Sequence, residues 1–232
     1  MELRADNVGL RLGSRPVLQD VTCTLPPGGH VLVLGRSGAG KTALLKVLAG
    51  LVAPTHGQVL WAGTRVAALP AADKRARQAA FGMVFQTDAL FDSMTVRGNV
   101  LLPLTRRRVP PEQAQARADE VLRAVGLADA ADALPERLSG GMRKRAGLAR
   151  ALAARPSVLL ADDPFAGLDP GTARQVARVL LEVAAEGSLL VAVPEPPPEL
   201  PLPRHWVLDA GRLVYDGPAG AAADAALDEA LA

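Results

Sequence analysis

The segment that most constrains this chain is Gly-Arg-Ser-Gly-Ala-Gly-Lys-Thr at positions 35–42, which fits the pattern GxxxxGK[ST]. It follows the predicted strand His30–Leu34 and precedes the helical run Thr42–Leu48. Glycines in such a loop let backbone N–H groups turn toward phosphate oxygens, and the helix N-terminus adds its positive dipole end. The glycine spacing does not fit the dinucleotide pattern GxGxxG. The segment therefore predicts a phosphate-binding loop between a strand and a helix.

Two side chains of this loop have specific chemistry. Lys41 is expected to reach the β and γ phosphates of a nucleotide, and the Thr42 hydroxyl is a suitable ligand for Mg²⁺. We expect phosphate contacts along the whole segment, from Gly35, Ser37, Gly38, Ala39, Gly40, Lys41 and Thr42.

Strand-like and helix-like segments alternate along the chain, which predicts an α/β fold with a mostly parallel core sheet. One example is Ser157–Ala161, which precedes a helical run from Gly171. Near-continuous apolar strands indicate burial on both faces of that sheet. The segments Leu3–Leu12 and Val17–Leu25 alternate more and predict an N-terminal antiparallel β subdomain.

Strand signals vanish after Gln86, and Pro111–Val125 and Gly141–Ala153 carry helical periodicity. We expect a helical subdomain over about residues 87–153, within a single domain of residues 1–232.

Two segments near the end of the chain have simple predicted structures. The prolines of Pro194–Pro203 exclude a helix and predict an extended surface connector. The tail Ala221–Ala232 predicts a short exposed helix or frayed coil.

Charge and composition limit the classes of partner that we expect for this chain. Lys and Arg total 26 and Asp and Glu total 24, so the net charge is 26 − 24 = +2, too balanced to indicate nucleic acid. Aromatic residues make up only 3% of the chain and do not interleave with its basic clusters, so we expect no nucleic-acid partner.

Cys23 is the single cysteine, and no apolar run comes near the length of about 20 residues that a membrane-spanning helix needs. With no secretory signal in Met1–Asp6, we expect a cytoplasmic chain.

Two further segments complete a nucleotide site. Val158–Pro164 is an apolar strand ending in carboxylates, where Asp162 is placed to hold Mg²⁺ through water. Ser139, Gly140 and Gly141 precede a helical run and supply a second set of N–H donors for a phosphate. This second set has no use within its own chain. We therefore expect a second subunit to present it, with two nucleotides sandwiched head to tail in a dimer.

With these motifs in this order, the chain resembles the nucleotide-binding subunit of an ABC transporter over essentially its whole length. The resemblance implies a P-loop ATPase with ATP and Mg²⁺ as cofactors, a membrane permease as partner, and a homodimer or a heterodimer with another ABC ATPase. It implies peripheral attachment to the inner cell membrane through that permease. Gln86 matches the family's Q-loop glutamine, which touches Mg²⁺ or water, and Asp169 matches the D-loop aspartate, which contacts the opposite subunit.

Three stretches also resemble the ATPases of bacterial MCE-type phospholipid transporters: Phe85–Phe91, Leu138–Arg145 and Pro164–Pro170. Methionine at position 142, where glutamine is commoner, is the most telling residue. This resemblance implies phospholipid transport.

The chain departs from the family at the base-binding end. Family members place an aromatic residue near Leu12 to stack on adenine, whereas no aromatic residue here precedes Trp61. We expect Leu12 and Val17 to offer apolar contact instead.

The residues expected to carry catalysis differ from the family pattern at two positions. Asp163 stands where the family has glutamate, and the position of the family's switch histidine falls on Val193 or Pro194. We expect Asp163, Gln86 and Lys41 to carry catalysis with attenuated turnover, and His205 to have a structural or surface role.

Two alternatives remain open. A degenerate subunit could bind ATP and pair with a competent ATPase, or act as an ATP-dependent clamp; the aspartate at 163 and the missing histidine favour it. An ABC protein of translation or DNA repair is disfavoured, because the chain has neither tandem cassettes nor a long coiled insertion.

Overall fold

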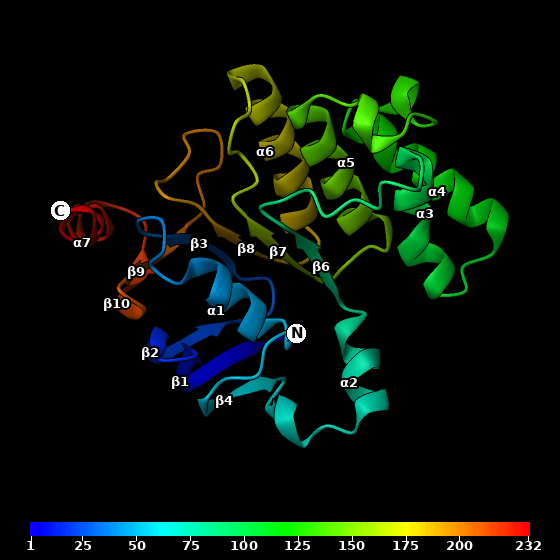
Figure 1. The fold of residues 1–232 in the computed structure, drawn as a ribbon. Helices are drawn as coiled ribbons and strands as arrows, with labels where there is room; N and C mark the ends of the chain where they lie inside the picture. Colours follow the sequence, from blue (N-terminus) through cyan, green and yellow to red (C-terminus); the bar gives the residue numbers. More distant parts are fainter.

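In the computed structural model, which describes all 232 residues, six strands form the central sheet (Figure 1). Their order is β10–β9–β3–β8–β7–β6, and neighbouring strands from β9 to β6 run parallel while β10 runs antiparallel to β9. The predicted α/β fold with a mostly parallel core sheet is confirmed. The strands are β3 (His30–Leu34), β6 (Phe81–Val84), β7 (Val158–Asp162), β8 (Ser188–Ala192), β9 (Arg204–Asp209) and β10 (Arg212–Pro218).

A second, antiparallel sheet has the order β2–β1–β4–β5. Its strands are β1 (Leu3–Leu12), β2 (Arg15–Leu25), β4 (His56–Trp61) and β5 (Thr64–Arg65). The sequence placed the start of the second strand at Val17, but pairing begins at Arg15, opposite Leu12. The reason is a two-residue turn in which Gly13 has a φ of +60°, a conformation that suits glycine.

Helix α1 (Lys41–Leu48) lies between the two sheets, as Figure 1 shows. Alternate residues of β3 serve two different cores. Val31 and Val33 pack with α1 and the antiparallel sheet, while Leu32 and Leu34 pack with the helices on the opposite face. Residues Val31–Leu34 of the strand are all apolar because both of its faces are buried, as the sequence predicted.

Helices cover the far face of the central sheet and extend beyond β6 (Figure 1). The helices expected at Pro111–Val125 and Gly141–Ala153 occur within one residue of those bounds. The helices after α1 are α2 (Ala71–Gln78), α3 (Val96–Arg106), α4 (Pro111–Ala124), α5 (Gly140–Ala153), α6 (Pro170–Ala184) and α7 (Ala221–Leu231). Short 3₁₀ turns lie at Val66–Ala68, Ala128–Ala130 and Pro135–Arg137. The sequence did not indicate α2, which buries no residue, or α3, which contains Pro103.

The C-terminal helix is not simply exposed, as the sequence suggested, because α7 buries Ala223, Leu227 and Ala230. The proline-rich segment contains neither helix nor strand, and its Leu200 and Leu202 are buried in the core. None of the helices has the length and apolar character that crossing a membrane requires.

Candidate functional site

The glycine-rich loop connects β3 to α1 through left-handed backbone. Gly35, Gly38 and Gly40 have φ values of 135°, 84° and 105°. A Cβ atom at Gly35 would lie 2.1 Å from the carbonyl oxygen of Leu208, and one at Gly40 would lie 2.7 Å from that of Val17. Glycine is therefore required at both positions, by conformation and by space.

The Lys41 side chain folds back over this loop. Its Nζ donates hydrogen bonds to the carbonyl oxygens of Gly35, at 2.5 Å, and Arg36, at 3.0 Å. Burial lowers the pKa of Lys41, and the nearby carboxylates of Asp163 and Asp162 oppose that shift. The ammonium group is thus positioned beside the loop that would surround a phosphate.

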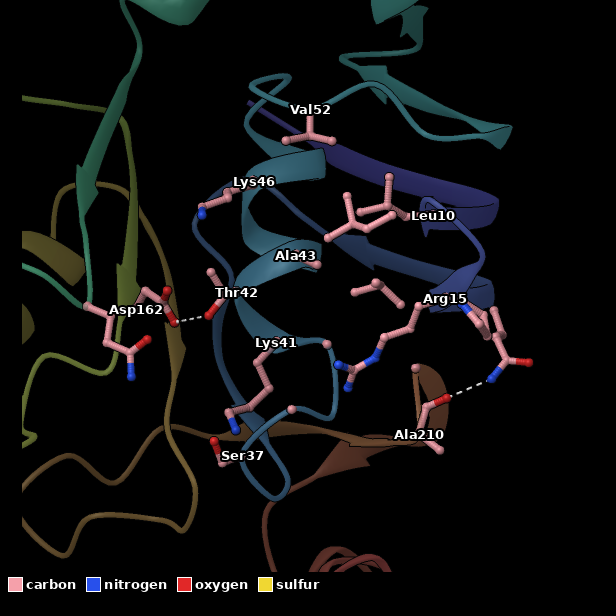
Figure 2. A pocket seen from close by; sticks show the side chains of 18 of the residues that line it. Leu10, Arg15, Ser37, Lys41, Thr42, Ala43, Lys46, Val52, Asp162 and Ala210 are labelled. Carbon is pink, nitrogen blue, oxygen red and sulfur yellow. Dashed lines mark hydrogen bonds between the residues drawn. The ribbon is translucent and has the colours of Figure 1, made fainter.

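Oxygen ligands for a hard cation meet where α1 begins and β7 ends. The Thr42 Oγ1 donates a 3.0 Å hydrogen bond to Oδ1 of Asp162, and Figure 2 shows these two side chains pointing toward one another. Asp162 is only 3% exposed, and desolvation raises its pKa, with the Thr42 hydrogen bond acting in the opposite direction. A buried carboxylate with a raised pKa gains stabilisation from a cation, so hydroxyl and carboxylate fit Mg²⁺. Gln86 lines the same cleft.

Asp163 follows in an unusual conformation. Its φ is +48°, its N–H donates to the Ala192 carbonyl at 2.8 Å, and its own carbonyl accepts a 3.0 Å hydrogen bond from Nζ of Lys144. Lys144 belongs to α5, so a residue of the helical region fixes the backbone that presents the Asp163 carboxylate to the cleft.

The cleft that joins these groups has a volume of about 850 Å³. Its far end is lined by Leu10, Leu12, Val17 and Val52 with Arg15, and contains no aromatic side chain. Leu12 is 64% exposed. The structure brings the following predicted site residues into this one cleft: Leu12, Ser37, Gly38, Gly40, Lys41, Thr42, Gln86, Asp162 and Asp163. Gly35 and Ala39 lie behind the loop, where both are buried.

The predicted second phosphate-binding set lies outside the cleft. Ser139, Gly140 and Gly141 are at the start of α5 and line no part of it. The Ser139 hydroxyl caps the helix by accepting a 3.3 Å hydrogen bond from the Met142 N–H. Ser139 and Gly140 are exposed. Asp169 likewise caps its own helix, α6, through the N–H groups of Gly171 and Thr172.

Of the two positions where the family's histidine was expected, only Pro194 faces the cleft. Pro194 lines the cleft and its carbonyl accepts a 3.2 Å hydrogen bond from Gly35 N–H, whereas Val193 is buried in the core. His205 lies within β9 at 5% exposure, so its place is in the sheet and not on the surface.

Comparison with known proteins identifies the family. The family model described as ABC transporter matches residues 18–166, which is more than half of the chain. This chain belongs to the ABC transporter family. The matched region runs from β2 past Asp163 and so contains the glycine-rich loop, Gln86, the Ser139–Gly141 segment and both carboxylates.

Curated relatives of this ABC protein carry the name methionine import ATP-binding protein MetN. That of Corynebacterium jeikeium is 41% identical over 206 residues, covering 86% of this chain and 55% of the relative. That of Mesorhizobium japonicum is 38% identical over 211 residues, covering 90% and 58%. The chain thus spans somewhat more than half the length of these relatives. The expected likeness to MCE-type phospholipid transporter ATPases is not supported, because these relatives carry the name of methionine importers.

Solved structures agree on the fold of this ABC protein. The ATP-binding cassette MJ0796, solved as a dimer in a post-hydrolysis state with ADP and Pi, has a TM-score of 0.87 at 26% identity, over 94% of this chain and 99% of that one. CbiO1 of Clostridium perfringens, part of the transporter complex CbiONQ, has a TM-score of 0.79 at 24% identity, over 93% and 88%.

Sequence reasoning missed three lysine and arginine residues near the site. Lys46 lines the cleft one helical turn after Thr42, so the spacing along α1 could have indicated it. Arg15 faces Leu12 across the hairpin, which the two-residue turn could have indicated. Lys144 reaches Asp163 only through the tertiary packing of α5, which no local pattern reveals.

Proposed function

We propose that this chain is the ATP-binding subunit of an ABC importer and couples the binding and hydrolysis of MgATP to a membrane permease. The observation that carries the proposal is the Thr42 hydroxyl bonded to the buried Asp162 carboxylate at the base of the glycine-rich loop, with Lys41 alongside. In this assembly the chain is a peripheral subunit that the permease holds at the membrane.

We assign the residues of the cleft to three roles according to their position: phosphate binding, Mg²⁺ binding and proton acceptance. Backbone N–H groups of residues 35–42 and the Lys41 ammonium would bind the phosphates, while Thr42, Asp162 and Gln86 would hold Mg²⁺ directly or through water. Mg²⁺ held there would supply positive charge that offsets the charge of the phosphates. Asp163 is the carboxylate that accepts the proton of the attacking water.

Two features support attenuated turnover. The Asp163 carboxylate is one methylene shorter than the family's glutamate, and Pro194 has no side-chain donor for the γ-phosphate. A misplacement of about 1 Å in a catalytic group costs about 10²-fold in rate.

The Ser139–Gly141 segment supports a nucleotide-dependent dimer. The segment lies at the N-terminus of α5, where Ser139 and Gly140 are exposed, and it does not line the cleft of its own chain. A second copy, or another ABC ATPase, brings such a helix N-terminus to the γ-phosphate end of the cleft. Dimers are also known for the related cassette MJ0796.

The cargo we propose is methionine, on the names of the relatives that are 38–41% identical to this chain. The cargo is recognised by the permease and its partners, so the chain itself contributes the energy-coupling step. The proposed methionine cargo is tested by measuring the uptake of labelled methionine by host cells with and without the gene for this chain. Unchanged uptake excludes methionine and leaves the ATPase proposal standing.

Binding of MgATP at the loop is tested with Lys41→Ala. Calorimetry is expected to show a loss of affinity of at least about 100-fold, because a charge-assisted contact to phosphate is removed from a partly buried site. Arg4→Ala, which removes a positive charge from the exposed surface of β1, is the control. Equal affinities for the wild type and Lys41→Ala would show that nucleotide binds elsewhere.

The dimer is tested by sedimentation with MgATP in the Asp163→Asn background, which slows hydrolysis. Dimers are expected there, and monomers when Gly140→Asp is added, because a carboxylate at the start of α5 repels the partner's phosphates. A monomer in the Asp163→Asn protein at high protein and ATP, with permease supplied, would remove the sandwich arrangement.

A further inference from the structure

The wall of the cleft formed by the β1–β2 hairpin lacks an aromatic residue but contains an arginine. Arg15 begins β2, directly opposite Leu12 in the register of the hairpin, and both residues line the cleft. Residues opposite one another in an antiparallel pair place their side chains on the same face. The arginine is therefore built into the wall that also carries the apolar residues Leu10, Val17 and Leu12.

The guanidinium of Arg15 points into the cleft and is unpartnered. Figure 2 shows its side chain reaching from the hairpin across the cleft toward the start of α1, with no hydrogen bond drawn to it. Neighbouring polar groups are engaged with one another: Arg11 donates to the Ser14 carbonyl, and Gln19 donates to the Ala210 carbonyl at 2.8 Å. No acidic side chain lines this end of the cleft, since Asp162 and Asp163 lie at the phosphate end.

We propose that Arg15 stacks its guanidinium on the purine base and replaces the aromatic ring that this cleft lacks. The guanidinium is planar and delocalised, and it stacks on aromatic faces through π-stacking and cation–π attraction. Leu12 and Val17 supply apolar contact but no flat delocalised face. The phosphates already have Lys41 and the loop N–H groups, so a further cation is not needed there. This inference rests on the proposed binding of MgATP.

The experiment compares two probes, MgATP and magnesium tripolyphosphate, by calorimetry. Tripolyphosphate carries the phosphates without a base. Arg15→Ala is expected to weaken MgATP binding by roughly 5- to 30-fold, the effect of losing one stacked base contact with an exposed arginine, and to leave tripolyphosphate binding within about twofold. Arg15→Lys keeps the charge but loses the plane, so it is expected to behave like Arg15→Ala, whereas Arg15→Tyr is expected to restore MgATP affinity.

The control is Arg4→Ala, which removes the same charge from β1 outside the cleft and should leave both affinities unchanged. Equal weakening of both probes, or rescue by Arg15→Lys, would make Arg15 a phosphate contact and overturn the stacking. Wild-type affinity for MgATP in Arg15→Ala would overturn it as well. These outcomes are separate from failure of the proposed function, in which MgATP binding of the wild type is absent or insensitive to Lys41→Ala.

Discussion

The two ends of the cleft are built in different ways. At the phosphate end, the main chain itself forms the binding surface, with glycine at Gly35 and Gly40 fixed by left-handed backbone and by neighbouring carbonyls less than 3 Å from any added Cβ. At the base end, side chains of the β1–β2 hairpin form most of the wall, and among them Leu12 is 64% exposed. The first end tolerates almost no substitution, while the second can change one residue at a time. Most of the affinity for a nucleotide should therefore come from the phosphate end, and most of the selectivity for its base from a few replaceable residues.

Among variants that compare the two ends of the cleft, we expect the largest change in ligand affinity for Asp162→Asn, at the phosphate end. Removal of the carboxylate takes away a buried ligand of the cation, so Mg²⁺ should no longer strengthen ATP binding, a loss of at least about 100-fold in Mg²⁺ affinity. Mg²⁺ titrations at fixed nucleotide measure it. An unchanged Mg²⁺ dependence would mean that the cation is held by other residues.

The same substitution should stabilise the protein without ligand. Desolvation raises the folded-state pKa of Asp162. A raised pKa gives stability that is present at low pH and lost as the pH rises through the folded value, so the ionised carboxylate lowers the free energy of unfolding at neutral pH. Asp162→Asn should therefore melt at a higher temperature than the wild type at pH 7, with the difference shrinking toward pH 4. A lower melting temperature of the variant at pH 7 would contradict this reasoning.

The second effect concerns catalysis at the phosphate end. Asp163→Glu combined with Pro194→His should raise the rate of ATP hydrolysis by about 10- to 100-fold with little change in ATP affinity, because both groups then reach the γ-phosphate region. Pro194 is the position to change because it lines the cleft, while a histidine at the buried Val193 would disturb the core. Fast turnover in the wild type with no gain in the double variant would show that other contacts carry hydrolysis.

A smaller effect is expected for Lys144→Met. The loss of the hydrogen bond to the Asp163 carbonyl should lower kcat by about 5- to 10-fold and leave the ATP dissociation constant unchanged, since the lysine bonds to the backbone of the proposed catalytic residue and does not line the cleft. Lys144→Arg, which keeps a donor, is the matched control and should retain more activity. A parallel change in ATP affinity would assign Lys144 to binding instead.

The smallest effect should appear at the base end. Leu12→Tyr adds an aromatic ring opposite Arg15 and should strengthen MgATP binding by about fivefold, the lower limit for a stacked base, because the position is so exposed. Tripolyphosphate binding should not change. A gain for both probes would show that the substitution acts on the whole cleft, and the two ends would then not be independent.

The sequence could predict the phosphate end because its chemistry is local. Eight consecutive residues contain the loop, and a strand and a helix on either side fix its place, so Lys41 and Thr42 could be placed in one cleft without knowledge of the rest of the fold. Asp162 could be placed there for a similar reason, because it ends a strand whose other residues are all apolar.

Features that depend on tertiary contacts could not be predicted. Lys144 lies 19 residues before Asp163, and only the packing of α5 against the end of β7 brings them together. Helix α2 has only eight residues, buries none of them and contains no large apolar side chain, so its sequence carries little signal for a packed helix. The phospholipid cargo, expected from the resemblance of Phe85–Phe91, Leu138–Arg145 and Pro164–Pro170, is not supported by the relatives, which are named as methionine import ATP-binding proteins.

The left-handed backbone of Asp163 has a consequence for how this site can change over generations. Aspartate to glutamate needs a single base substitution, so the family's usual carboxylate is always one mutation away. Aspartate tolerates a positive φ better than most side chains do, whereas other L-residues pay about 1–2 kcal/mol for it. A lineage that acquired glutamate here would gain reach toward the water and lose folding stability in the same step. Faster variants should therefore persist only where a second substitution, in the segment after β7 or in α5, has first relaxed that backbone.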